Sequence, residues 1–153
     1  ITSVSAYKQR VGAALSTLKT GLPKAKLFIA SVPDLKQLWE VGKGNAAART
    51  AWKLGGICKT MLENPTSAAK ADSDRRDRVR QRVIDYNKVL EQACKSYGEN
   101  CVFDNNAVFN YKFSGKVLSN WDFFHPNVRG QEELARVTRA AGFDWPGSGS
   151  AKD

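Results

Sequence analysis

Apolar residues near the start of the chain recur at the spacing of one helix face. Between residues 3 and 19 they lie three or four positions apart, which is the period of an amphipathic helix. These apolar positions are Val4, Tyr7, Val11, Ala14, Leu15 and Leu18. Gly21 and Pro23 follow, and both disfavour continuation of a helix. We therefore expect a helix over residues 3–19.

Two short apolar runs further along the chain are typical of strands. Residues 26–31 contain the longest unbroken apolar run, and residues 101–104 contain a second short one. A continuous apolar run predicts a strand that is buried on both faces, as the strands of parallel sheets are. Asp34 comes soon after the first run and can cap a short helix that reaches Trp39.

The longest helical pattern covers residues 67–97. Its apolar stripe consists of Val79, Val83, Tyr86, Leu90 and Ala93 or Cys94. The charged residues of 72–82 fall largely on the opposite face, which favours a solvated face with acid–base pairs, although clustered arginines can also bind phosphates. A last helix is expected over residues 131–141, and residues 146–153 are expected to form a disordered tail.

The order of these elements predicts an α/β fold. Strands that alternate with helices form parallel sheets covered by helices on both faces. Two strands are too few for such a sheet, because most of their backbone groups would lack partners. We therefore expect residues 1–145 to be the C-terminal part of a single larger domain, whose further strands lie on a segment that these 153 residues do not contain.

The composition is that of one soluble globular domain. Of the 153 residues, 42% are hydrophobic and 25% are charged. No apolar run approaches the roughly 18 residues that a membrane-spanning helix needs. The sequence shows no signal peptide, which a processed chain would have lost. The formal net charge of +9 favours an anionic partner such as a phospholipid surface or a nucleic acid, and the alternative is that the surplus Lys and Arg only serve solubility.

The three cysteines indicate whether the protein resides in an oxidising or a reducing compartment. Cys94 and Cys101 bracket a short polar segment, so a disulfide between them is geometrically easy and would fit an oxidising, extracellular location. Cys58 would then have no partner in this chain, which indicates a free thiol or a bond to another chain. The alternative is three buried, reduced cysteines in a cytosolic protein.

Residues 121–131, WDFFHPNVRGQ, hold the only histidine of the chain. A histidine with an ordinary pKa near 6.5 suits a general base at neutral pH. Asp122 lies three residues before His125 on a turn closed by Pro126, so its carboxylate can orient the imidazole. A polar surface turn is the alternative. One histidine supplies no metal-ligand set, and no phosphate-cradling glycine motif occurs, so we expect neither a metal nor a cofactor.

Residues 121–135, WDFFHPNVRGQEELA, resemble the last block of the SGNH (GDSL-type) hydrolases, in which Asp-x-x-His-Pro precedes a helix that opens with Gly-Gln. Residues 27–39, 57–94 and 101–113 are also similar to the secreted actinobacterial lipase and phospholipase branch of that family. The resemblance spans nearly all of residues 4–143. It is specific as a set, although no single block is.

The resemblance implies a three-layer α/β/α sandwich with a parallel sheet and a Ser–His–Asp mechanism. Carried over by position, His125 is the general base and Asp122 its orienting acid. The family's Gly-Asp-Ser and Gly-x-Asn-Asp blocks, which supply the nucleophile and oxyanion donors, do not occur in these 153 residues. The resemblance therefore implies an N-terminal segment that carries them. In this branch a cysteine commonly follows the Asn-Asp motif, so Cys58 would bridge to that segment.

The resulting expectation is a secreted carboxylic-ester hydrolase of lipase, esterase or phospholipase type. Its partners would be an acyl-ester or lipid substrate, the N-terminal segment and an anionic lipid surface. Leu38, Trp39, Phe123 and Phe124 are candidates for lining an apolar acyl site, with core packing as the alternative. Two further hypotheses are a carbohydrate or polyester deacylase on the same fold and a non-catalytic basic binding module. We do not expect nucleic-acid binding, because the Arg-rich helix lacks interleaved aromatic residues.

Overall fold

The structure is a computed structural model that describes residues 1–143 and residue 145. The expected tail of residues 146–153 lies outside the described residues. The elements in chain order are α1 (Val4–Gly21), β1 (Leu27–Ile29), α2 (Leu35–Gly42), α3 (Ala46–Gly55), α4 (Lys59–Leu62), α5 (Lys70–Tyr97), β2 (Cys101–Phe103), α6 (Ala107–Asn110), the 3-10 turn η1 (Gly115–Val117) and α7 (Val128–Ala140).

The two expected strands form a two-stranded parallel sheet. Leu27 is opposite Cys101, Phe28 opposite Val102 and Ile29 opposite Phe103. Their positions confirm the sequence pattern, but the expectation that the first strand is buried on both faces is wrong. All three β1 residues are only half-buried, because β1 pairs with one neighbour among the described residues. The described chain is therefore a mixed α/β fold that is mostly helical.

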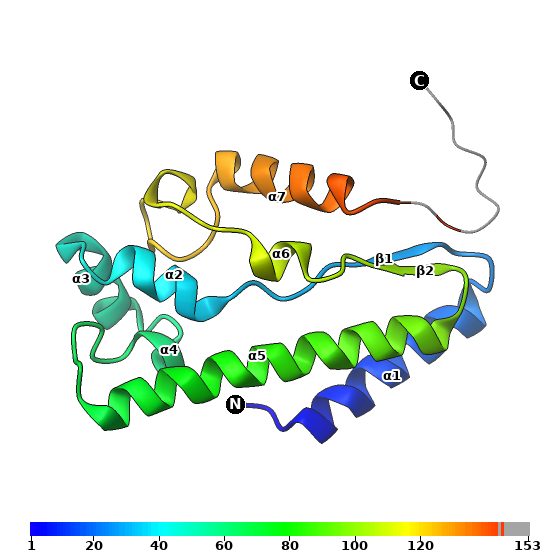
Figure 1. The fold of residues 1–153 in the computed structure, drawn as a ribbon, viewed down its shortest axis with the longest axis horizontal. Coiled ribbons are helices and arrows are strands. Elements are labelled where there is room, and N and C mark those ends of the chain that lie inside the picture. Colours follow the sequence, from blue (N-terminus) through cyan, green and yellow to red (C-terminus); the bar gives the residue numbers. More distant parts are fainter. Residues whose placement is uncertain (144, 146–153) are drawn as a thin grey trace.

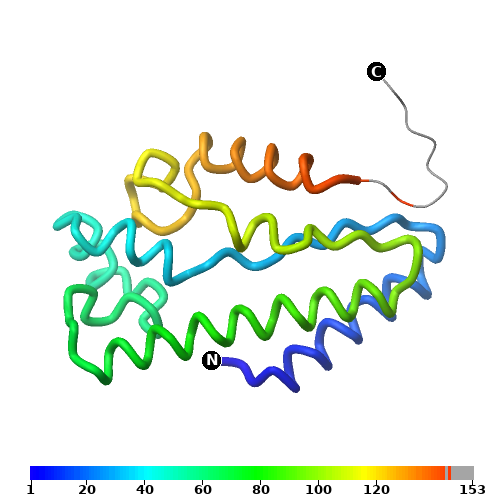
Figure 2. The backbone as a smooth tube through the Cα atoms, in the orientation of Figure 1, coloured from blue at the N-terminus to red at the C-terminus, as the bar shows by residue number. Residues whose placement is uncertain are grey.

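Helices lie on both sides of this small sheet. In Figure 1 the strands run between α5 and α1 on one side and α7 on the other, and Figure 2 traces the same path of the backbone. The long helix α5 contacts both strands as well as α1. This arrangement has the helix placement of an α/β fold, while the full three-layer sandwich remains an expectation.

The helix α1 begins at the Ser3 cap, as the pattern indicates, and packs along α5. The ring of Tyr7 stacks on Tyr86 with centroids 4.0 Å apart, and Arg82 and Tyr86 both donate to the carbonyl oxygen of Thr2. None of the α1 residues, all of which are described, is fully buried. Hence α1 covers α5 from one side only.

The expectation of a solvated charged face on α5 is only partly correct. The acid–base pairs Lys70–Asp74 and Arg75–Asp72 do form. Arg76, however, is only 2% exposed. It donates to the carbonyl oxygen of Ser67 at 2.6 Å and lies 4.3 Å from the ring of Trp39. The cause is tertiary: the segment before α5 folds back over its first turns, so arginines there bind backbone carbonyls instead of water.

The disulfide between Cys94 and Cys101 is present, with their Cα atoms 5.3 Å apart. It joins the last turn of α5 to the first residue of β2. It therefore fixes the direction in which the chain enters the sheet, because helix end and strand start cannot separate. Cys58 has no disulfide partner among the described residues and is half-buried.

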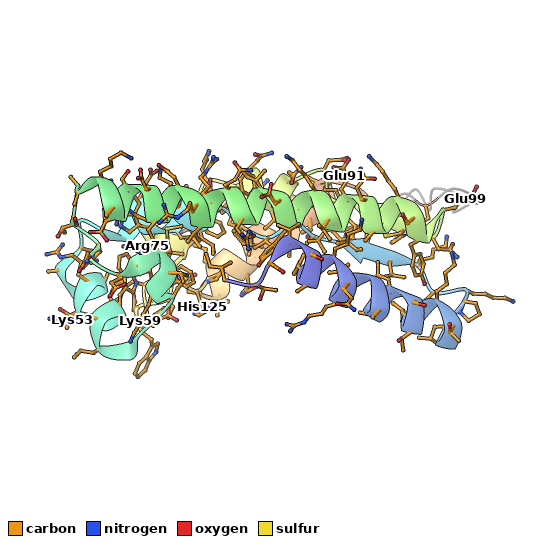
Figure 3. All side chains as sticks on the ribbon, turned by 90° about the horizontal axis from the view of Figure 1, so that it is seen from below. Lys53, Lys59, Arg75, Glu91, Glu99 and His125 are labelled. Atoms are coloured by element: carbon orange, nitrogen blue, oxygen red, sulfur yellow. A yellow bond between two sulfur atoms is a disulfide. The ribbon has the colours of Figure 1, made fainter. Side chains whose placement is uncertain are left out.

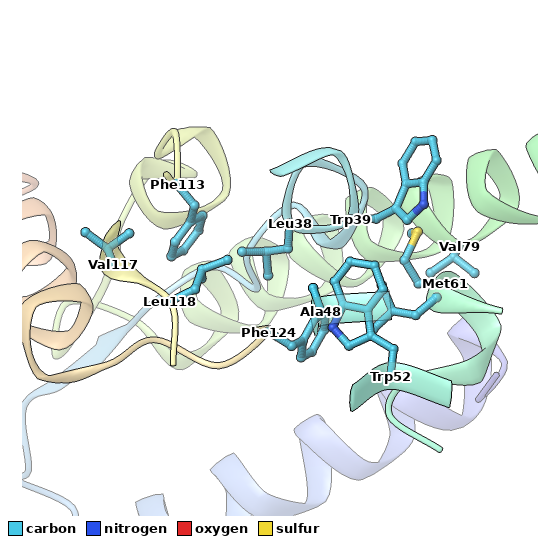
Figure 4. Close-up of a cluster of buried hydrophobic side chains, with 11 residues drawn as sticks. Leu38, Trp39, Ala48, Trp52, Met61, Val79, Phe113, Val117, Leu118 and Phe124 are labelled. Carbon is cyan, nitrogen blue, oxygen red and sulfur yellow. The ribbon is translucent and has the colours of Figure 1, made fainter. Parts of the chain in front are cut away.

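The main hydrophobic core lies beside the sheet rather than on it. Figure 4 shows side chains from α2, α3, α4 and α5 packed against the segment of residues 113–124. Its buried members are Leu38, Trp39, Ala48, Trp52, Met61, Leu62, Val79, Phe113, Val117, Leu118 and Phe124. This core supports the turn that carries His125.

Candidate active site

The turn at residues 122–125 brings its acid and its histidine into direct contact. The Oδ2 atom of Asp122 lies 2.5 Å from the Nδ1 atom of His125. The other carboxylate oxygen, Oδ1, accepts hydrogen bonds from the backbone N–H groups of Phe124 at 3.0 Å and His125 at 3.1 Å. One carboxylate therefore shapes the turn and orients the ring at the same time.

The hydrogen bonds to Asp122 favour its charged form. Partial burial acts to raise the pKa of this carboxyl. The hydrogen bonds from the His125 ring and from the two backbone N–H groups outweigh burial, so the pKa lies below its usual value. Asp122 is consequently ionised at neutral pH and can stabilise an imidazolium.

The backbone of the turn adopts a conformation that side chains seldom tolerate. Phe123 has φ of +53°, in the left-handed region that a bulky residue rarely occupies. Such a conformation costs on the order of 1–3 kcal/mol and persists only when its surroundings enforce it. Here the N–H of Phe123 donates to Ser119 O at 2.9 Å, and that of Ser119 donates to His125 O at 2.8 Å. These bonds close the loop around Phe123.

Trp52 of α3 fixes the turn from the core side. Its indole N–H donates to the carbonyl oxygen of Asp122 at 2.8 Å, and its ring is almost completely buried. The ring fits only because position 42 is a glycine, since a Cβ atom there would overlap the six-membered ring of Trp52. Neither residue was identified from the sequence, because a ten-residue spacing between a glycine and a tryptophan carries no recognisable signal.

The first turn of α7 fixes the other side of the site. Asn127 caps α7 by accepting from the N–H of Gly130 at 2.9 Å, and its amide donates to the carbonyl oxygens of Lys116 and Leu118. A Cβ atom at position 130 would overlap the carbonyl oxygen of Val117. The cap explains why α7 begins at Val128, three residues before the expected start. The glycine of the Gly-Gln pair is required by this close approach.

The histidine ring faces outward from this support. The side chain of His125 is 69% exposed, and the edge of the Phe124 ring packs against it with centroids 5.3 Å apart. Figure 3 shows His125 at the same end of the molecule as Lys53 and Lys59. Across residues 1–143 and 145, the Nε2 atom of His125 makes no hydrogen bond. That nitrogen is the atom that a general base would use.

The residues expected to line an acyl site lie close to the turn, mostly as core. Leu38, Trp39 and Phe124 are buried, and Phe123 is half-buried. The indole N–H of Trp39 donates to Pro65 O at 2.9 Å, while Phe124 supports the imidazole. These contacts describe packing, and substrate contact by the four side chains stays a prediction. Phe123 has the most accessible surface of the four.

The described part of the chain holds no group of three His, Cys, Asp or Glu side chains that could bind a metal ion. Within the same residues, no helix has both the length and the apolar composition to cross a bilayer.

Comparison with protein-family models, with curated proteins and with solved structures finds no match to this chain. The resemblance to SGNH hydrolases therefore rests on the sequence blocks quoted above. The geometry of the turn is an independent observation.

Proposed function

We propose that this chain is the acid–base part of a secreted carboxylic-ester hydrolase of lipase, esterase or phospholipase type. The observation that carries the proposal is the 2.5 Å contact between Asp122 Oδ2 and His125 Nδ1, with Nε2 of the same ring exposed. An orienting carboxylate on one ring nitrogen and an accessible second nitrogen are what a serine hydrolase requires of its base.

The proposed reaction is acyl transfer to water in two steps. His125 Nε2 takes the proton of a serine hydroxyl, and the serine oxygen attacks the ester carbonyl. His125 then gives that proton to the leaving alcohol, and the acyl group stays on the serine as an ester. In the second step the same nitrogen takes a proton from water, and the water oxygen attacks this ester. The proton returns to the serine oxygen as the carboxylic acid is released. Asp122 stays ionised throughout and stabilises the imidazolium.

We place the serine and the oxyanion donors on an N-terminal segment outside these 153 residues. Three features support this: the missing Gly-Asp-Ser block, the single strand neighbour of β1 among the described residues, and Cys58. The half-buried Cys58 lies directly before α4 and directly after Ile57, whose N–H donates to Trp52 O at 3.2 Å. A disulfide from Cys58 would hold the segment near the turn and would fit the oxidised Cys94–Cys101 pair.

The alternative of a basic nucleic-acid module has weaker support. Its sequence argument was the Arg-rich helix α5. Arg75 donates to the carbonyl oxygens of Thr60 and Glu63, and Arg76 is buried against Trp39. Guanidinium groups engaged in this way are not presented to a phosphate backbone. A deacylase of carbohydrates or polyesters would use the same dyad and is separated from a lipase by its substrates.

Ester hydrolysis by the protein expressed from its complete gene tests the proposal. Short- and long-chain nitrophenyl esters, a phospholipid and an acetylated sugar form the substrate panel. His125→Ala should lower kcat by on the order of 10⁴-fold, because the serine loses its base. The exposed neighbour Asn120→Ala serves as the matched control and should keep normal activity. Ester hydrolysis that survives His125→Ala would refute the proposed function.

A further inference from the structure

Two large apolar side chains are exposed at the end of the molecule that carries the dyad. Trp121, the neighbour of Asp122, is 93% exposed, and Leu54 of α3 is 83% exposed. Their elements are tied together, because Trp52 of α3 donates to Asp122 O. A tryptophan with this exposure leaves a large apolar surface in contact with water, which is unfavourable, whereas its amphipathic ring is favoured at a membrane–water interface.

The same end is rich in positive charge. Between residues 41 and 62 the cations are Lys43, Arg49, Lys53 and Lys59, and no Asp or Glu occurs. Lys43 already lies over the ring of Trp39, at 4.3 Å from its centroid. The other three line a hollow of about 460 Å³ between α3 and α4, together with the apolar Ile57 and Leu62 and one acid, Glu63. In Figure 3 Lys53 and Lys59 lie at the end that holds His125, while Glu91 and Glu99 lie toward the other end.

We propose that this end, with Trp121, Leu54, Lys53 and Lys59, is a docking surface for an anionic phospholipid bilayer. Trp121 and Leu54 enter the headgroup region, and the two exposed lysines contact lipid phosphates, while Arg49 donates to the carbonyl oxygen of Lys43. The charge of the hollow is complementary to such a surface, and basic residues and apolar side chains act together in binding anionic membranes. The benefit of docking rests on the proposed function, since it would bring His125 close to lipid esters.

Binding of the protein expressed from its complete gene to vesicles tests this surface independently of catalysis. Co-sedimentation compares phosphatidylcholine vesicles with vesicles that also contain phosphatidylglycerol. We expect binding only to the anionic vesicles, with a blue shift of Trp fluorescence. Trp121 is the expected source of that shift, because Trp39 and Trp52 are buried, and Trp145 is half-buried with its indole N–H bonded to the carbonyl oxygen of Leu27. The shift should be lost in Trp121→Phe, although the Phe variant still binds.

Matched variants distinguish the contribution of charge to vesicle binding from the contribution of apolar contact. The double variant Lys53→Gln with Lys59→Gln should lower the partition coefficient by roughly five-fold for each lysine removed. The control, Lys24→Gln with Lys88→Gln, removes two exposed lysines from other elements and should change binding much less. Similarly, Leu54→Gln should weaken binding, whereas Leu22→Gln at the end of α1, where Leu22 is 59% exposed, should not.

Three results would overturn the docking surface. Equal losses in both lysine pairs would mean that net charge alone drives binding. Unchanged binding in Trp121→Gln and Leu54→Gln would exclude insertion of these side chains. A dimer in sedimentation velocity that Trp121→Gln dissociates, without any effect on vesicle binding, would assign the patch to a second copy of the chain. His125→Ala should bind vesicles normally, so failure of catalysis and failure of docking are distinguishable.

Discussion

At the scale of the residue, Asp122 has both a structural role and a proposed catalytic role. Its Oδ1 atom holds the backbone of Phe124 and His125, and its Oδ2 atom holds the imidazole. An amide at this position could still accept backbone bonds through its oxygen. It would present an NH₂ donor to Nδ1, and the ring would then adopt the opposite tautomer.

The substitution Asp122→Asn should therefore leave the fold intact and lower kcat for esters by on the order of 10⁴-fold. Circular dichroism and the urea midpoint check the fold, and nitrophenyl ester hydrolysis measures the rate. Activity close to that of the parent would show that another acceptor, such as a backbone carbonyl near Trp121, orients the ring in place of the carboxylate.

At the scale of the element, the site depends on the fit of α3 against α2. Trp52 can donate to Asp122 only while its ring occupies the space that Gly42 leaves open. The added methyl of Gly42→Ala should cost about 1–3 kcal/mol in unfolding free energy, as overpacking of a core does. It should also lower esterase activity, because displacement of Trp52 releases the Asp122 carbonyl.

The matched control for that change is Gly44→Ala. A Cβ atom at position 44 meets no neighbour within 4 Å, and the φ of Gly44 is not positive. Urea unfolding and ester hydrolysis of Gly44→Ala should equal those of the parent. Similar losses in the two variants would mean that the loop after α2, rather than the Trp52 ring, sets the site.

The start of α5 predicts a pH dependence of stability. The hydrogen bond from Arg75 is the main cause that lowers the pKa of Asp72 from 3.8 to about 2. Because the folded pKa lies below the unfolded one, this stabilisation is fully present above pH 3.8 and is lost as pH falls through about 2. Urea midpoints of the parent and Asp72→Asn should differ at pH 5 and converge toward pH 2. A constant difference would contradict the assigned pKa.

Elements with local signals could be predicted from the sequence, whereas tertiary choices could not. The spacing of Val4, Tyr7 and Val11 predicted α1. Asp34, a residue type that caps helices, predicted the start of α2, and in the structure it accepts from the N–H groups of Lys36 and Gln37. The burial of Arg76 was not predictable, because it depends on carbonyls of a loop that folds back from residues 64 and 67. From the spacing of the charges alone, Arg76 was expected to face solvent.

The same distinction between local and tertiary contacts applies to the candidate site. Asp122 and His125 are three residues apart, so a single turn decides their contact, and the sequence pattern was sufficient to predict it. Trp52 reaches the turn from α3, Gly42 makes room for its ring, and Val117 lies against Gly130 of α7. Their role follows from packing over long separations, and no local pattern indicates it. The half-burial of β1 likewise follows from its single strand neighbour among the described residues, which its own residues do not reveal.

At the scale of the whole molecule, one idea connects the sheet, Cys58 and the dyad. The described residues give β1 a single strand neighbour, leave Cys58 without a disulfide and leave Nε2 of His125 without a hydrogen bond. A further segment that adds strands, a cysteine and a serine would complete all three. We infer that the dyad serves a serine on such a segment.

Labelling with a fluorophosphonate, followed by intact-mass analysis with and without reductant, tests that claim most directly. The protein is expressed from its complete gene and labelled at neutral pH. We expect a phosphonylated serine outside residues 1–153, a disulfide to Cys58 that opens only when reductant is added, and no labelling in His125→Ala. A label on a serine within these 153 residues, or equal labelling of His125→Ala, would contradict it.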